Sequence, residues 1–251
     1  MLKVRIIPLI QLNGSSVVKT INFKKFRTVG DAISTVKIFS RRMADEMLIV
    51  DINASKTKKI NFNFLNIISK ECFMPLTLGG GIKNEHDVEK LFEVGADKVI
   101  LNSLFYEDPI LLKKIISKYG SQAVVFSLDV KSKNKKMNIF SNSKKKINED
   151  LNIEKILDQL HKIGVGEILF NSVDNDGTTK GYNYNLIKQI SNYANIPLIA
   201  AGGCGQVDDC LKAINSGANA IAAGSIFYWV GESVISIKKY LEKSGINIRM
   251  L

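Results

Sequence analysis

The sequence predicts a single (β/α)8 barrel, a TIM barrel built from two similar half-barrels, over residues 1–251. Three observations support this fold class. Short apolar runs alternate with amphipathic stretches along the whole chain, which is the pattern of repeated βα units. The length of 251 residues is typical of one such barrel. An internal repeat, described below, divides the chain into two related halves.

Eight apolar runs are the predicted strands of the barrel. They are continuously apolar rather than alternating, as expected for parallel strands that are covered on both faces. The stretches between them, such as "NEHDVEKLFEVGA" and "DDCLKAINSGA", have the periodicity of amphipathic helices and reach a glycine that favours a helix end. A doubly wound open sheet is the alternative, but no GxGxxG motif follows the first strand. In chain order the predicted strands are Val4–Ile10, Met47–Asp51, Pro75–Leu78, Lys98–Asn102, Ala123–Asp129, Glu167–Asn171, Pro197–Ala201 and Ala220–Ala223.

The internal repeat consists of two similar segments of about thirty residues that align without a gap. "PLTLGGGIKNEHDVEKLFEVGADKVILNSLF" begins at Pro75 and "PLIAAGGCGQVDDCLKAINSGANAIAAGSIF" begins at Pro197, an offset of 122 residues. Each half of the barrel is therefore expected to supply the same kind of site. Besides the opening Pro-Leu and a Gly-Gly pair, the matched positions include Asp87 and Asp209, Gly95 and Gly217, Ala96 and Ala218, Ser103 and Ser225, and Phe105 and Phe227.

Composition limits the function classes. The net charge of +11 reflects a lysine-rich surface, and its densest run, Lys131–Lys146, has the composition of a mobile loop or hairpin. This run lacks the interleaved aromatic residues of a single-strand binder, so we expect no nucleic-acid partner. The three cysteines, Cys72, Cys204 and Cys210, form no CxxC pair, which favours free thiols in a reducing cytoplasm. No uncharged run is long enough for a signal peptide or a membrane span.

Each repeat places Gly-Gly after one strand and a small polar residue after the next. Glycines let backbone N–H groups approach an anion closely, and (β/α)8 barrels often bind phosphate after strands 7 and 8. Two sites on opposite sides of the barrel mouth would hold a substrate with a phosphate at each end. The alternative is that these glycines only form tight βα turns. The candidates are Gly80, Gly81, Asn102 and Ser103 in the first repeat, and Gly202, Gly203, Gly224 and Ser225 in the second.

Several carboxylates follow predicted strands, where barrels carry their catalytic residues. They are Asp51 after strand 2, Asp129 after strand 5, and Asp174 and Asp176 after strand 6. A carboxyl group at the end of an apolar strand is desolvated, which raises its pKa towards the range useful for proton transfer. The alternative for the last two is turn chemistry in the Asn-Asp-Gly loop. The only histidines, His86 and His161, lie on predicted helices, so we expect no metal and no other cofactor.

Across essentially its whole length, the sequence resembles the cyclase (HisF) subunit of imidazole glycerol phosphate synthase. The "DxDGTxxGY" loop favours this family over its sister isomerase of histidine synthesis. The resemblance implies a barrel that receives ammonia from a separate glutaminase subunit and uses it on a bis-phosphate substrate at the mouth. The matching segments are "RIIP", "VVKT.NF", "GD" at Gly30-Asp31, "DINAS", "PLTLGGGI", "GADKVILNS", "GSQAVV", "LDVK", "GEIL.NS.D.DGT..GY", "IP.IA.GG" and "AAGSIF".

The resemblance also implies roles for particular residues. Two acids of the family act as general acid and base; Asp129 matches the one on strand 5, while Gln11 stands at the position of the one on strand 1. Lys19 matches a residue that helps to bind phosphate, and Asp174, Gly177 and Thr178 are expected to support the same function. A ring of charges at the bottom of the barrel, where the glutaminase docks and ammonia enters, is matched by Arg5, Glu46, Lys98 and Glu167. The alternative for these four is ordinary exposed charge at strand starts.

The chain departs from the family at the top of the barrel. Gln11 cannot exchange a proton near neutral pH, because its amide offers only a hydrogen-bond donor and an acceptor. The first loop reads "QLNGSSVVK" where the family has "DVKDGRVVK", and "NSKKK" lacks the glycine of the family's turn after strand 5. These changes cluster where cyclisation would occur, while the charge ring and both phosphate sites are retained.

This pattern predicts a specialised HisF-like paralogue. Such a barrel and its glutaminase would supply ammonia for amidation of a bacterial surface sugar, with a third protein performing the amidation. One alternative is a working histidine-pathway cyclase in which another group replaces the missing acid. A second is a non-catalytic scaffold that docks and activates the glutaminase. Nucleic-acid binding through Lys131–Lys146 is a further hypothesis from a different class.

Overall fold

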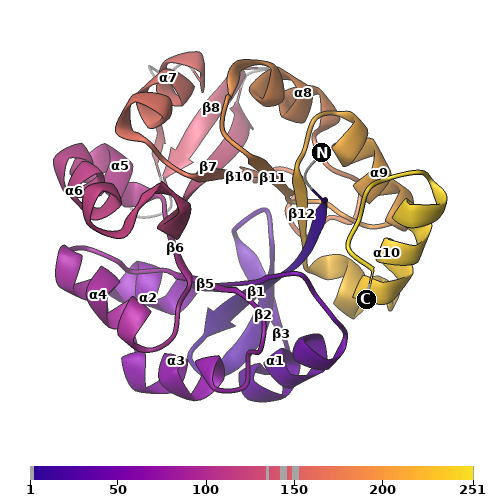
Figure 1. Ribbon diagram of the computed structural model, residues 1–251, viewed down its shortest axis with the longest axis horizontal. Helices are drawn as coiled ribbons and strands as arrows, with labels where there is room; N and C mark the ends of the chain where they lie inside the picture. Colours follow the sequence, from indigo (N-terminus) through magenta and orange to yellow (C-terminus); the bar gives the residue numbers. More distant parts are fainter. Residues whose placement is uncertain (1–2, 134–135, 142–145, 149–152, 251) are drawn as a thin grey trace.

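The computed structural model describes residues 3–133, 136–141, 146–148 and 153–250 of the chain. Eight parallel strands form a closed ring, because the first and last strands of the ring also pair with each other (Figure 1). This confirms the predicted (β/α)8 barrel. Around the ring the strands are β1 (Arg5–Asn13), β4 (Met47–Asp51), β5 (Leu76–Gly79), β6 (Lys98–Leu101), β7 (Val124–Lys133), β10 (Glu167–Ser172), β11 (Leu198–Ala201) and β12 (Ala220–Ala223).

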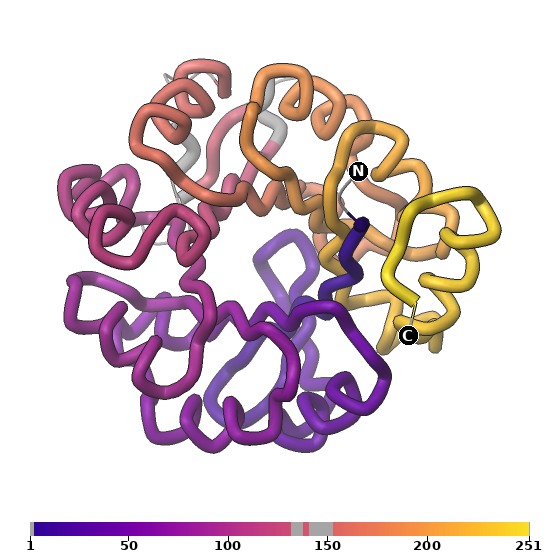
Figure 2. Tube along the Cα trace, in the orientation of Figure 1, coloured from indigo at the N-terminus to yellow at the C-terminus, as the bar shows by residue number. Residues whose placement is uncertain are grey.

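Helices surround the strands on the outside, as the chain trace shows (Figure 2). Most occupy the connection between successive barrel strands, so the chain advances around the ring by βα units. No helix of the described part is long and apolar enough to cross a membrane. The helices are α1 (Ala32–Arg41), α2 (Ile52–Thr57), α3 (Phe62–Ser69), α4 (Glu85–Glu93), α5 (Ser103–Glu107), α6 (Pro109–Tyr119), α7 (Ile153–Ile163), α8 (Tyr184–Tyr193), α9 (Val207–Asn215) and α10 (Val234–Lys243), with a short π-helical turn over Ile226–Val230.

The core has two layers, which explains the continuously apolar strands. One cluster lies inside the barrel and includes Ile7, Leu48, Ile100, Val125 and Leu169, each 6% exposed or less. The other cluster lies between the outer faces of the strands and the helices. Alternate residues of each strand point to opposite faces, so both faces must be apolar.

β10 ends one residue later than predicted, and two other strands extend well beyond their predicted C-terminal ends. β1 continues to Asn13 and pairs with β2 (Ser16–Ile21), which pairs in turn with β3 (Lys25–Asp31). β7 continues to Lys133 and pairs with β8 (Lys136–Ser141), followed by β9 (Lys146–Asn148). These hairpins were not predicted as strands, although the second falls in the run Lys131–Lys146, where a loop or hairpin was expected. Strands 1 and 5 of the barrel are thus both extended, one in each half.

The matched aspartates of the repeat have a helix-capping role. Asp87 accepts a hydrogen bond from the backbone N–H of Lys83 at 2.8 Å, and Asp209 accepts one from Gly205 at 2.9 Å. Each carboxylate lies at the third position of its helix, α4 or α9, and satisfies backbone donors that the helix leaves unpaired. The repeat therefore preserves the helix start after each Gly-Gly turn.

Candidate functional site

A central cavity opens at the C-terminal ends of the barrel strands. Gln11 of β1 and Asp129 of β7 both line it, together with Thr20, Ser127 and Asn171. β1 and β7 are four strands apart in either direction around the ring, so the amide and the carboxylate lie on opposite sides of the barrel. Both residues lie within extended strands, where the sequence placed them at strand ends. The structure therefore brings the two residues together at one cavity.

The amide of Gln11 is held by the hairpin of β1 and β2. Its Oε1 accepts a hydrogen bond from the backbone N–H of Thr20 at 3.0 Å, and its Nε2 donates to Thr20 Oγ1 at 3.1 Å. The Thr20 hydroxyl also donates to the Asp176 carboxylate. Gln11 is only 6% exposed, so both ends of its amide are used in buried hydrogen bonds.

Asp129 has the properties of an acid or base that works near neutral pH. Its carboxylate accepts hydrogen bonds from Ser127 Oγ at 2.9 Å and from Asn102 Nδ2 at 3.2 Å. Burial raises the pKa of Asp129 to about 7; the hydrogen bond from Ser127 opposes this rise, and the charge of Asp176 adds to it. A carboxyl group with this pKa can both take up and release a proton at physiological pH.

Asp176 and Lys19 are a buried pair of opposite charges, and Thr20 lies between Gln11 and Asp176. Burial raises the pKa of Asp176, while the hydrogen bond from Thr20 and the positive charge of Lys19 act in the opposite direction. Lys19 donates from Nζ to the Leu9 carbonyl at 2.8 Å, and burial lowers its pKa to about 8. The two charges therefore stabilise each other where water is largely excluded.

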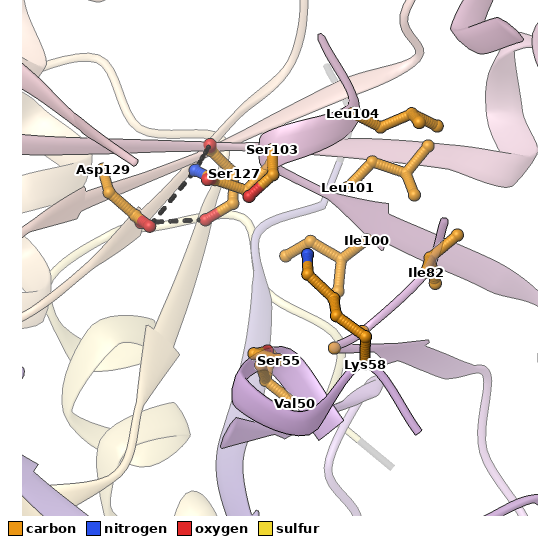
Figure 3. Close-up of a pocket in the computed structure, with 13 residues that line it drawn as sticks. Val50, Ser55, Lys58, Ile82, Ile100, Leu101, Ser103, Leu104, Ser127 and Asp129 are labelled. Carbon is orange, nitrogen blue, oxygen red and sulfur yellow. Dashed lines mark hydrogen bonds between the residues drawn. The ribbon is translucent and has the colours of Figure 1, made fainter. Parts of the chain in front are cut away.

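The first predicted phosphate site forms one cavity (Figure 3). Gly80 and Gly81 line it together with Asn102 and Ser103, and Asp129 forms part of its wall. Gly80 has a φ of 106°, and a Cβ added there would lie 2.2 Å from the Asp51 carbonyl oxygen. Only glycine fits this backbone, so the main chain itself forms the wall of the cavity.

The second predicted site forms a matching cavity on the other half of the barrel. Gly202, Gly203, Gly224 and Ser225 line it, with Gly177, Lys19 and Asp176. A Cβ added to Gly224 would lie 1.9 Å from Lys19 Nζ, so the ammonium group sits directly against the glycine backbone. A cation and glycine backbone at one cavity suit a phosphate group.

Three predicted site residues do not join these cavities. Asp51 caps helix α2, because its carboxylate accepts hydrogen bonds from the N–H groups of Asn53 at 2.9 Å and Ala54 at 2.8 Å. Asp174 is exposed, and the Thr178 hydroxyl donates to the Asn175 carbonyl at 2.8 Å. None of the three residues lines the two glycine cavities. The catalytic role expected of Asp51 and the phosphate-binding role expected of Asp174 and Thr178 stay predictions.

The sequence reasoning missed Thr20, Ser127 and Asn171. Ser127 lies two residues before Asp129, so both side chains point into the barrel, and this signal was available in the strand alternation. Thr20 could be found only from the pairing of β2 with β1. The buried Oδ1 of Asn171 accepts no hydrogen bond from the described residues, which suits a ligand in the cavity. The described residues contain no group of three or more histidine, cysteine, aspartate or glutamate side chains that could hold a metal ion.

Four charges close the opposite, N-terminal end of the barrel. Arg5 Nη1 donates to Glu46 at 2.6 Å and to Glu167 at 2.9 Å. Lys98 Nζ contacts the same two carboxylates at 3.2 and 3.0 Å. The predicted charges therefore form a ring of alternating sign, with side chains between 11 and 22% exposed.

Comparison with known proteins identifies the family. The model of the histidine biosynthesis protein family matches residues 5–231. A protein of Campylobacter jejuni named "Putative imidazole glycerol phosphate synthase subunit hisF2" is 41% identical over 251 residues, covering 100% of both chains. The imidazole glycerol phosphate synthase subunit HisF of Dictyoglomus thermophilum is 40% identical with the same coverage, and that of Chlorobium limicola is 37% identical over 252 residues. The chain belongs to the HisF family.

The predicted resemblance to HisF is thus confirmed over the whole barrel. HisF relatives cover the full chain, so the sequence similarity includes the residues of the extended strands β1 and β7. The Campylobacter relative carries the name of a second HisF subunit, which is consistent with the paralogue that the sequence predicts. This chain is accordingly a HisF-family barrel that carries Asp129, both glycine cavities and the charge ring.

The raised pKa of Asp129 predicts a pH-dependent change in stability for Asp129→Asn. Since the folded-state pKa exceeds that of an unfolded aspartate, the folded chain binds one more proton between the two values. The stability contributed by this group is complete below pH about 4 and is lost as pH rises to about 7. We expect Asp129→Asn to stabilise the chain by about 2–4 kcal/mol at pH 8 and to have little effect at pH 4.

Thermal unfolding at both pH values measures this effect. Asp158→Asn, an exposed substitution of the same kind on α7, is the matched control and should change the melting temperature equally little at either pH. An Asp129→Asn variant that is destabilised by the same amount at pH 4 and pH 8 would show that the buried charge is not the cause.

Proposed function

We propose that this chain is an ammonia-channelling barrel that serves amidation of a bacterial surface sugar. A glutaminase subunit docks at the N-terminal face, ammonia passes through the barrel, and a third protein uses it for amidation. The observation that carries the proposal is the amide of Gln11, which is bound to Thr20 where the cavity faces Asp129. We place the complex in the cytoplasm, where a reducing environment suits the three free cysteines.

The charge ring supports an ammonia entrance at the N-terminal face. Arg5 and Lys98 each contact both Glu46 and Glu167, so a shift of one cation leaves the carboxylates partnered by the other. The ring could therefore open for ammonia while Glu46 and Glu167 each keep one cation as a partner. Above the ring, the barrel interior is lined by apolar side chains including Ile7, Leu48 and Val125, which suit passage of neutral ammonia rather than ammonium.

The two glycine cavities support a phosphorylated small-molecule ligand or phosphate ions at the mouth. Their backbone walls and the ammonium group of Lys19 offer donors and positive charge on both halves of the barrel. Asp129, between them, can exchange a proton near neutral pH. Gln11 cannot, so the side chain at this position of β1 supplies no general acid or base to the cavity.

One observation favours a working histidine-pathway cyclase as the second candidate. Asp176 reaches the Thr20 hydroxyl that also contacts Gln11, and burial raises its pKa. Asp176 would then replace the missing strand 1 acid. Asp176→Asn tests this second candidate. If the unaltered chain is a cyclase that uses Asp176, the substitution should abolish its turnover; under the proposed function, neither protein forms imidazole product.

Reconstitution with a HisH-type glutaminase tests the proposal. We expect the barrel to stimulate glutamate release from glutamine while forming no imidazole product from the family's bis-phosphate substrate. Imidazole product at a rate typical of the family would contradict the proposal. A pure scaffold would stimulate glutamate release to the same extent after Lys98→Ala, and its ammonia would reach no acceptor even in the presence of the amidating protein.

A further inference from the structure

Lys58 has an unusual backbone conformation for its residue type. It ends helix α2 with φ 57° and ψ 32°, and its N–H donates to the Ala54 carbonyl. This left-handed position at a helix end favours glycine, because a side chain with a Cβ is strained there. A strained residue persists where the surrounding structure holds it, and such positions often have a functional use.

The side chain of Lys58 lines the first phosphate cavity. Figure 3 shows it extending from the end of α2 past Ser55, with Nζ directed towards Ile100 and the interior of the cavity. The glycine backbone at Gly80 and Gly81 borders the same cavity. Lys58 forms no ion pair with any residue in the described ranges. Its positive charge is therefore available to a ligand in this cavity.

Charge in the cavity gives Lys58 a specific role. Of the described residues that line it, Lys58 is the only cation, and Asp129 is the only carboxylate. A phosphate group placed beside an ionised Asp129 would be repelled unless a cation compensates. The second cavity has the same combination, because Lys19 and Asp176 both line it.

We propose that Lys58 binds the phosphate of the first cavity, as the counterpart of Lys19 in the second, and that its left-handed conformation directs Nζ there. This inference rests on the proposed phosphate sites and adds the cation that the first site would otherwise lack. The two lysines are not related by the internal repeat. Lys19 comes from the hairpin strand β2, whereas Lys58 comes from the end of the helix that follows β4.

Three variants separate ligand binding from backbone strain. Lys58→Met removes the charge and keeps the strain, so the melting temperature should change by less than about 1 °C. Lys58→Gly removes both and should raise the melting temperature by about 1–3 °C. Lys59→Gly is the matched control: Lys59 is exposed, its φ is not positive, and glycine there should slightly lower the melting temperature.

Binding of inorganic phosphate is measured site by site from backbone amide NMR signals. Gly80, Gly81 and Ser103 report the first cavity, and Gly203 and Ser225 report the second. Both Lys58 variants should weaken phosphate binding at the first cavity by about tenfold or more and change the second by less than about twofold. Lys59→Gly should leave both titrations unchanged.

Two outcomes of the variant titrations would overturn the inference while leaving the proposed phosphate sites in place. The first is an unchanged titration of the first cavity in Lys58→Met, and the second is an equal loss at both cavities, which would indicate only a general effect of net charge. Neither outcome depends on ammonia transfer or on any acceptor. If phosphate failed to perturb the first cavity in the unaltered chain, the proposed phosphate site itself would be wrong, and the Lys58 inference with it.

Discussion

Replacing Gln11 by aspartate is expected to create ammonium-dependent cyclase turnover at least about 10²-fold above that of the unaltered chain. A positioned acid or base contributes about 10²–10⁴-fold to a rate, and the aspartate would face Asp129 across the cavity. The two glycine cavities, where we propose that the phosphates bind, are already formed. The measurement is formation of imidazole product from the family's bis-phosphate substrate with excess ammonium and no glutaminase.

Gln11→Asn is the matched control for this gain. Asparagine has the size of aspartate but, like glutamine, exchanges no proton near neutral pH. It should therefore show no gain over the unaltered chain. A gain of similar size in both variants would mean that shortening the side chain, rather than restoring an acid, produces the activity.

Lys98→Ala is expected to uncouple the barrel from a glutaminase partner. Lys98 contacts both Glu46 and Glu167, and its removal leaves the two carboxylates with Arg5 as their shared cation. Without the Lys98 ammonium group, the carboxylates of Glu46 and Glu167 repel each other more strongly, so the ring should rearrange. Ammonia released by the glutaminase should then escape to solvent instead of entering the barrel. In the Gln11→Asp background, product formed from glutamine should fall about tenfold or more relative to product formed from free ammonium.

The ratio of the two nitrogen sources makes this test specific. A general loss of folding would reduce both activities, whereas an altered entrance reduces only the glutamine-dependent one. Lys114→Ala provides the control, because Lys114 is an exposed lysine that pairs with Glu85 on the outside of the barrel. An unchanged ratio in Lys98→Ala would contradict the assignment of the ring as the ammonia entrance.

The barrel strands could be predicted because burial on both faces leaves a strong apolar signal. β4 and β12 have the predicted bounds, Met47–Asp51 and Ala220–Ala223. The hairpin strand β3 lacked this signal, since most of its residues are exposed. Because the hairpin was not predicted, the sequence indicated only that Gln11 is an amide at the barrel mouth. It did not indicate that Thr20 binds this amide and links it to Asp176. These hydrogen bonds depend on the register in which β2 pairs with β1, and this register cannot be read from the residues of either strand alone.

The carboxylates show a second limit of sequence reasoning. Asp51 and Asp129 both follow apolar runs, yet Asp51 precedes a helix and caps it, while Asp129 remains in an extended strand and faces the cavity. A capping aspartate and one that faces the cavity look alike in the sequence, because each follows a run of apolar residues; only the structure shows that Asp51 accepts from backbone N–H groups and Asp129 from the side chains of Ser127 and Asn102. Lys58 gave no sequence signal, since its role depends on a left-handed backbone at a helix end.

The most direct test of the proposed function is a cyclase assay of the unaltered chain. It needs only the purified protein, the family's bis-phosphate substrate and excess ammonium, so neither the glutaminase nor the charge ring affects the outcome. With Gln11 in place, we predict no imidazole product above the rate without protein. Turnover close to that of Gln11→Asp would contradict the account, because the chain would then be a working cyclase that needs no acid on β1.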